Sequence, residues 1–198
     1  MEILKIILVT FFAGMGAGLG TGFAGMSAAA VITPMLVTFL GVEPYMAVGI
    51  ALASDVLASA VSAYTYGKNK NIDIKNGLLM MAAVLLFTVV GSYVSKLVPS
   101  STMGNFSVFM TFLLGVKFIV KPVMTTKEKM QSVSAKKRAV QSVVCGTVIG
   151  FICGFIGAGG GMMMLLILTS VLGYELKTAV GTSVFIMTFT ALTGSVSH

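Results

Sequence analysis

Long apolar stretches follow one another from Ile3 to the last residue of this chain, and only short polar joints interrupt them. A helix needs about 20 apolar residues to cross a hydrocarbon core about 30 Å thick. A chain of 198 residues therefore holds roughly seven or eight such segments, and no room remains for a soluble catalytic or nucleotide-binding domain. The pattern predicts an all-α polytopic membrane protein whose function is built inside the lipid bilayer.

The composition points the same way, because only 10% of the residues are charged, against about 25% in soluble domains. The net charge of +7 could indicate a nucleic-acid partner, but lysine and arginine also gather in the cytoplasmic loops of membrane proteins. We therefore expect no nucleic acid. Cys145 and Cys153 lack CxxC spacing, and we expect neither a cofactor nor a metal site.

The polar joints divide the chain into about eight expected membrane segments. Two of them, 28–40 and 162–172, are too short to cross the membrane comfortably, and each follows a glycine-rich stretch. We expect broken or re-entrant helices at both places. The eight segments are residues 3–25, 28–40, 46–66, 77–98, 103–120, 139–156, 162–172 and 178–198.

The basic residues predict the orientation. The joints at 67–76 and 121–138 lie on one side, since two segments separate them, and the positive-inside rule makes that side cytoplasmic. Of the 13 lysine and arginine residues, only Lys5 and Lys96 then fall outside. The joint at 121–138 is also the longest polar stretch, and we interpret it as a solvated cytoplasmic linker between two halves. The expected location is the cell membrane, with the chain crossing it several times.

The chain contains an internal repeat at an offset of 132 residues. Five segments separate the starts of the two copies, so the second copy should enter the membrane from the opposite side. Inverted-topology repeats are typical of many secondary transporters, which alternate between two shapes around a central site. The matching positions are Gly14, Gly18, Gly22, Phe23, Gly25, Leu40, Gly41, Glu43 and 47–49, which fall on Gly146, Gly150, Gly154, Phe155, Gly157, Leu172, Gly173, Glu175 and 179–181.

This repeat divides the chain into a first repeat at 1–120, the linker at 121–138 and a second, inverted repeat at 139–198. The second copy has counterparts of only the first three segments of the first copy. We therefore expect an incomplete second repeat, in a chain that lacks two helices.

Two glycine-rich breaks are the candidate substrate sites. Consecutive glycines weaken a helix by about 1 kcal/mol each and let backbone amides point into a cavity. A helix that restarts after such a break presents its positive N-terminal end, which suits an oxyanion. Residues 25–28 and 157–162 are the expected amide cradles, with hydroxyl groups as additional donors. The candidate substrate-binding residues are Gly25, Ser27, Gly157, Gly159, Gly160, Gly161, Thr182 and Ser183.

Close helix packing is the alternative explanation for the spaced glycines. Glycines at every fourth position let two helices approach each other closely. We expect packing for the two ladders, and a ligand-facing break for the uninterrupted glycines 159–161. The ladders are Gly14, Gly18, Gly22 in the first copy and Gly146, Gly150, Gly154 in the second.

The second-copy motifs resemble a known family. The break GFIGAGGG at 154–161, Leu172-Gly173 and AVGTS at 179–183 look like the sulfite exporter TauE/SafE family of membrane permeases. The joint that runs from Tyr66-Gly67 to Asn71-Ile72-Asp73 resembles that family as well. The resemblance implies a permease for small anions, sulfur-containing oxyanions such as sulfite or sulfonates, energised by an ion gradient.

Asp55 is the one acid well inside an expected membrane segment. A carboxylate at that depth costs a few kcal/mol, so it should face a cavity or a partner. Its expected role is coupling through a proton or a cation, and the alternative is a structural hydrogen bond to a nearby Ser or Thr. A direct role in binding an anion is not expected, because a carboxylate would repel it.

Three functional classes remain open, with a secondary anion transporter as the first. A passive anion channel or a structural membrane subunit is the alternative. An intramembrane enzyme is not expected, because the sequence has no HExxH motif, no GxSxG motif with a suitable His and no paired intramembrane Asp. The expected partners are a small anionic substrate and the lipid bilayer, and the sequence leaves open whether the protein forms a homo-oligomer.

Overall fold

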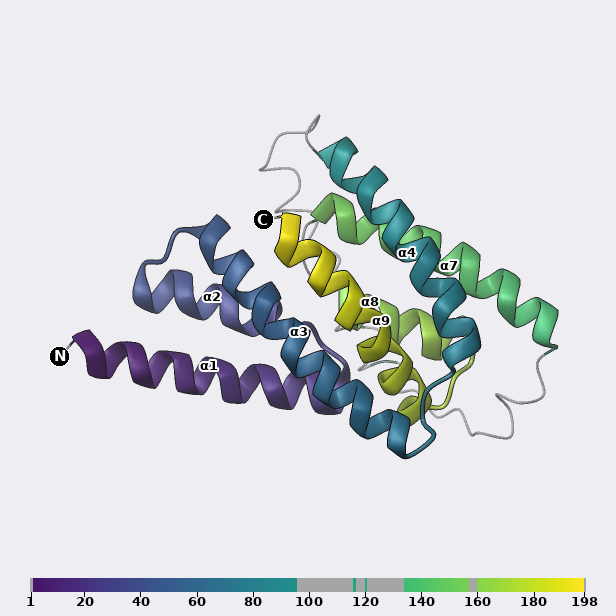
Figure 1. Cartoon of the computed structure of the whole chain (residues 1–198), viewed down its shortest axis with the longest axis horizontal. Coiled ribbons are helices and arrows are strands. Elements are labelled where there is room, and N and C mark those ends of the chain that lie inside the picture. Colours follow the sequence, from purple (N-terminus) through teal and green to yellow (C-terminus); the bar gives the residue numbers. More distant parts are fainter. Residues whose placement is uncertain (1, 96–115, 117–119, 121–133, 157–159, 198) are drawn as a thin grey trace.

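The computed structural model describes residues 2–95, 116, 120, 134–156 and 160–197 (Figure 1). These residues form a bundle of helices and contain no β-strand. The helices are α1 (Glu2–Ala24), α2 (Ala29–Leu40), α3 (Pro44–Lys68), α4 (Ile74–Ser95), α7 (Ala135–Ile156), α8 (Gly160–Ser170) and α9 (Leu176–Ser197).

Four of the described helices are long and apolar enough to cross a membrane. They cover Ile3–Ala24, Met46–Lys68, Ile74–Gly91 and Leu176–Thr193, where membrane segments are expected. The expected segment at 139–156 lies within α7, and the segment at 103–120 lies almost wholly outside the described residues. The all-α architecture is therefore confirmed, while the number of eight segments is not tested.

The two short segments are short helices. With a rise of about 1.5 Å per residue, α2 and α8 are only about 16–18 Å long, because they contain 12 and 11 residues. Both are shorter than a hydrocarbon core of about 30 Å. Each follows a longer helix, α1 or α7, across the glycine-rich segment that was expected to interrupt it.

Glycines with positive φ mark where α2 and α8 end. Gly41 has φ 63° and Gly173 has φ 66°, in the left-handed region that favours glycine. Just beyond them, the amide of Val42 bonds the carbonyl of Leu36 at 3.2 Å, and the amide of Tyr174 bonds that of Leu168 at 2.9 Å. The same backbone turn therefore closes the short helix at matching positions of the two sequence copies.

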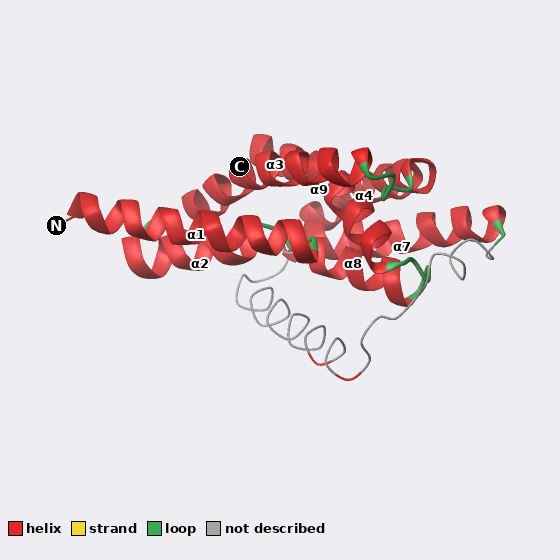
Figure 2. Ribbon diagram, turned by 90° about the horizontal axis from the view of Figure 1, so that it is seen from below, coloured by secondary structure: helices red, strands yellow, loops and turns green. Residues whose placement is uncertain are grey.

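The buried apolar residues form two clusters. One lies among α1, α2 and α3, and the other joins α4, α7, α8 and α9. Helix α4 packs along α7, and α3 packs against α9. Figure 2 shows α3 and α9 on one side of the bundle, with α1, α2 and α8 on the other.

The two glycine ladders have different surroundings. A methyl group on Gly146 would lie 2.7 Å from the carbonyl oxygen of Met80, and one on Gly150 would contact that of Val84, so the second-copy ladder packs against α4. Gly14, Gly18 and Gly22 would find no described atom within 4 Å. No described helix lies on the first-copy ladder, so the packing expected there stays a prediction. Gly154 lies outside the residues whose side-chain surroundings are described.

Candidate functional site

The first helix break is a tight turn between α1 and α2. Gly25 has φ 60°, and its amide bonds the carbonyl of Thr21 at 3.1 Å. The Thr21 hydroxyl donates to the carbonyl of Met26 at 2.9 Å, which holds the chain as it leaves α1. The break thus depends on a glycine conformation that other residues rarely adopt.

Asp55 of α3 holds the beginning of α2. The Ser27 hydroxyl donates to Oδ2 of Asp55 at 2.6 Å, and the amide of Ala28 donates to Oδ1 at 2.9 Å. Both side chains are buried, with Asp55 only 1% exposed. A carboxylate is favourable at the positive end of a helix. The amide cradle expected at 25–28 is therefore occupied by the protein's own acid.

The second break faces the first at the beginning of α8. A methyl group on Gly161 would contact the carbonyl oxygen of Gly25 and would lie 2.9 Å from the amide nitrogen of Ser27. The same methyl group would lie 2.6 Å from Sδ of Met187 on α9. Two glycine-rich segments far apart in the sequence therefore meet backbone to backbone. We call this contact of Gly25, Ser27, Gly161 and Ser183 the break junction.

Ser183 completes the break junction from α9. Its side chain is fully buried, and its Oγ lies 2.5 Å from the position that a methyl group on Gly25 would occupy. The Ser183 hydroxyl donates to the carbonyl of Val180 at 3.0 Å. This bond uses the only proton of the hydroxyl, so the donor that was expected to serve an anion is engaged within α9.

The remaining candidate residues are placed differently. Gly160 begins α8, and a methyl group on it would lie 2.6 Å from Sγ of Cys153 on α7. Thr182 is buried but accepts a hydrogen bond from the amide of Asp73 at 3.1 Å, so its hydroxyl supports the joint between α3 and α4. Gly157 and Gly159 lie outside the described residues.

The two sides of the break junction differ in charge. At the repeat offset, the position of Asp55 corresponds to Met187, and the position of Ala28 corresponds to Gly160. The N-terminus of α2 therefore has a carboxylate bound to it, whereas α8 has a thioether at the matching place. The first amides of a helix have no partner within it and favour negative charge.

Nowhere in the described part of the chain do three or more His, Cys, Asp or Glu side chains form a metal-binding group.

A second polar cluster lies at the end of the bundle where α4, α7 and α9 begin. It joins the α3–α4 joint, α4, α7 and the α8–α9 turn. Asp73 precedes α4 and accepts hydrogen bonds at Oδ2 from the Tyr174 hydroxyl and the Asn76 amide group, both at 2.7 Å. Nη1 of Arg138 on α7 lies 3.9 Å from the same oxygen, and its guanidinium group lies 5.7 Å from the centre of the Tyr174 ring. Burial, with the neighbouring Asp73 carboxylate, raises the pKa of the Tyr174 phenol well above its ordinary value.

The sequence patterns do not predict that these residues form one cluster. Only Asp73 stood out in the sequence, as part of the joint that resembles the TauE/SafE family. Tyr174 and Arg138 come from distant positions, and no spacing rule connects them to Asp73. The clue available in the sequence was a tyrosine directly after Leu172-Gly173, at the turn between two apolar segments.

Replacing Tyr174 by phenylalanine should weaken the tie between α4 and the α8–α9 turn. The change removes a buried hydroxyl that donates to a carboxylate, and we expect a loss of about 1.5–3 kcal/mol of stability. The measurement is the midpoint of thermal unfolding in detergent. Tyr93→Phe is the matched control, because the Tyr93 ring is 69% exposed on α4. Equal midpoints for the two variants would contradict a stabilising role for the Tyr174–Asp73 bond.

Comparison with known proteins identifies the family. Residues 10–198 match the family model described as sulfite exporter TauE/SafE. The probable membrane transporter protein YunE of Bacillus subtilis (strain 168) is 28% identical over 98% of this chain and 77% of its own length. The probable membrane transporter protein MJ0441 of Methanocaldococcus jannaschii is 26% identical over 98% of this chain and 71% of its own length.

No solved structure gives a significant match to this chain. The family match covers nearly the whole chain, and four described helices are able to span a membrane. These findings confirm the resemblance drawn from the glycine motifs, and the chain is a multi-pass protein of the cell membrane that belongs to the sulfite exporter TauE/SafE family.

Proposed function

We propose that the protein is a secondary transporter of small anions, most specifically of sulfur-containing oxyanions or sulfonates such as sulfite, driven by an ion gradient. The break junction carries this proposal. The N-terminal amides of α8 lie where the two helix breaks meet, and Met187 stands there in place of a carboxylate. Such a helix end favours an anion, while Asp55 already neutralises the equivalent end of α2.

An inverted repeat would explain how the site opens to each side in turn. Helices α1–α3 correspond in sequence to α7–α9, and the equivalent helices α3 and α9 pack against each other beside the break junction. In transporters with inverted repeats, the two halves move around a site at their interface. The proposed orientation places the joints at 67–76 and 121–138 in the cytoplasm, because those joints carry most of the positive charge.

Uptake of radiolabelled sulfite into liposomes that contain the purified protein tests this function. We expect accumulation above protein-free liposomes when an ion gradient is imposed, and competition by unlabelled thiosulfate or a sulfonate. Entry of sulfite only to its equilibrium level, independent of the imposed gradient and accompanied by unitary currents in a planar bilayer, would instead establish a passive anion channel. Absence of uptake for every sulfur oxyanion and sulfonate would overturn the proposed substrate class.

Asp55 is the proposed coupling residue. Asn at this position has nearly the same shape and retains an oxygen that accepts from the Ala28 amide, but it cannot bind a proton or a cation through a charge. We expect Asp55→Asn to abolish gradient-driven accumulation while exchange of labelled for unlabelled anion continues. The measurements are concentrative uptake and counterflow in the same liposomes.

Ser54→Ala provides the matched control for coupling. It removes a hydroxyl one residue from Asp55 that donates to the carbonyl of Ile50, but it leaves the carboxylate and its bonds from Ser27 and Ala28. We expect this variant to retain gradient-driven accumulation. If Asp55→Asn accumulates sulfite as the parent protein does, Asp55 serves only to hold α2, and coupling must reside elsewhere.

A further inference from the structure

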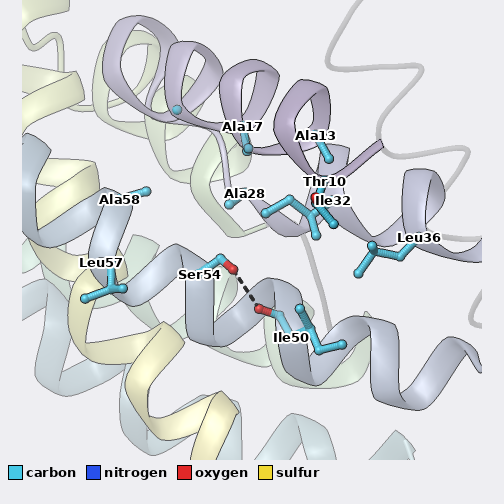
Figure 3. Close-up of a pocket in the computed structure, with 12 residues that line it drawn as sticks. Thr10, Ala13, Ala17, Ala28, Ile32, Leu36, Ile50, Ser54, Leu57 and Ala58 are labelled. Carbon is cyan, nitrogen blue, oxygen red and sulfur yellow. Dashed lines mark hydrogen bonds between the residues drawn. The ribbon is translucent and has the colours of Figure 1, made fainter. Parts of the chain in front are cut away.

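A groove runs along α1 and is open on the outside of the first half. Its volume is about 320 Å³, and Thr10, Gly14 and Gly18 of α1 line one side of it. Residues of α2 and α3 complete the lining (Figure 3), and the side chains of Ile50 and Leu57 on α3 are 44% and 72% exposed. The groove follows the direction of α1 and is lined mostly by apolar side chains. No described segment of the chain occupies it.

The same surface is covered in the second half. At the repeat offset, Thr10, Gly14 and Gly18 correspond to Ser142, Gly146 and Gly150. Ser142 is fully buried, and methyl groups on Gly146 and Gly150 would touch the backbone carbonyl oxygens of Met80 and Val84 in α4. Helix α4 thus lies directly on this stripe, at a distance that only small residues permit.

The α3 side of the groove and its counterpart on α9 show the same difference. Ile50 and Ser54, which line the open groove, correspond to Thr182 and Ile186. Thr182 is 1% exposed and Ile186 is 0% exposed, and Cγ2 of Thr182 lies 3.2 Å from the position that a methyl group on Gly77 of α4 would occupy. Helix α4 therefore contacts the counterparts of both Gly18 and Ile50, whereas in the first half Ile50 is 44% exposed and a methyl group on Gly18 has no described atom within 4 Å.

We infer that the α1 groove is the docking site of one further transmembrane helix, the second-repeat counterpart of α4. The inference rests on the repeat and not on the proposed transport activity. In an inverted repeat, this helix crosses the membrane in the direction opposite to α4. Its contact face is apolar and brings its backbone against Gly14 and Gly18, as the backbone of α4 lies against Gly146 and Gly150.

A peptide with the sequence of α4 (Ile74–Ser95) is the probe for this groove. The purified chain, with Cys145 and Cys153 replaced by alanine, carries the change Gly18→Cys, and the peptide carries Val84→Cys. Both are placed in lipid nanodiscs and oxidised, and the disulfide-linked adduct is quantified by mass spectrometry. Leu19→Cys is the matched control, because Leu19 lies at the same depth, is 54% exposed and faces away from the groove residues on α1.

We expect an adduct at Gly18 that exceeds the adduct at Leu19 by about tenfold, which corresponds to a preference of about 1.4 kcal/mol. A second pair, Gly14→Cys in the chain with Met80→Cys in the peptide, should react similarly. Adding Gly18→Leu to the Gly14→Cys chain should remove that adduct, because a bulky side chain on α1 projects into the groove.

Three results would overturn this inference. Equal adducts at Gly18 and Leu19 would mean that the peptide only collides with α1. A disulfide between two Gly18→Cys chains in place of the peptide adduct would assign the groove to a second copy. Phospholipid that stays bound in native mass spectrometry and blocks the peptide would assign it to lipid. Unfolding midpoints of the cysteine variants that match the parent chain exclude misfolding as the cause.

Discussion

Replacing Gly161 by alanine is expected to abolish sulfite uptake and to lower the unfolding temperature. The added methyl group would contact the carbonyl oxygen of Gly25 and would lie 2.9 Å from the amide nitrogen of Ser27. Both contacts are with backbone, so relief requires α8 to move away from the break between α1 and α2. Overpacking of this kind typically costs about 1–3 kcal/mol. The movement would also separate the backbone groups of the break junction.

Gly160→Ala is the matched control one residue away. Its methyl group would meet the thiol of Cys153 at 2.6 Å, and its near contacts within the described part of the chain are with that side chain and not with backbone. A side chain can rotate, so we expect a smaller effect, and combining Gly160→Ala with Cys153→Ala should restore uptake. Uptake in liposomes and thermal unfolding in detergent measure both consequences. Normal uptake by Gly161→Ala would show that the two breaks do not need to be in contact.

Replacing Gly150 by alanine is expected to separate α4 from α7. The methyl group would contact the carbonyl oxygen of Val84 and lie 2.8 Å from its Cα, so the clash is again with backbone. Helices that meet through glycine lose their close packing when a methyl group enters the contact. We expect a loss of about 1–3 kcal/mol of stability, seen as a lower unfolding midpoint.

Gly18→Ala makes the same chemical change at the matching position of the first repeat. A methyl group there has no described atom within 4 Å. The higher helix propensity of alanine should therefore leave the isolated chain unchanged or stabilise it by up to about 1 kcal/mol. Thermal unfolding of both variants in one detergent tests the contrast. Equal losses for Gly150→Ala and Gly18→Ala would show that the two ladders are packed alike.

The position and type of most helices could be predicted from the sequence. Segments 3–25, 28–40 and 46–66 agree with α1, α2 and α3 to within about two residues. The agreement is close because a membrane helix is defined by a local property, a run of apolar residues long enough for the bilayer. Glycine turns are local as well, since Gly41 and Gly173 adopt a conformation that other residues avoid. The family, too, could be recognised from such short glycine motifs.

The candidate site could be predicted only in part. Gly25, Ser27, Gly161 and Ser183 do lie together, as expected from two breaks that face one centre. Thr182, next to Ser183 in the chain, has its hydroxyl bonded to the amide of Asp73 instead. Neighbouring residues on a helix point in directions about 100° apart, so adjacency in the motif does not place both side chains in one site.

Sequence patterns alone were enough to determine which stretches are helices, where they break and which family the chain belongs to, because each of these depends on residues close together in the chain. The tertiary structure decided which partner each residue meets. Gly18 and Gly150 occupy the same place in the repeat, yet only Gly150 has a helix against it. Asp55 is acidic in any context, but only the packing of α3 beside α2 places its carboxylate on Ser27 and the Ala28 amide. Such contacts join residues far apart in sequence, and the spacing of residues along one segment carries no record of them.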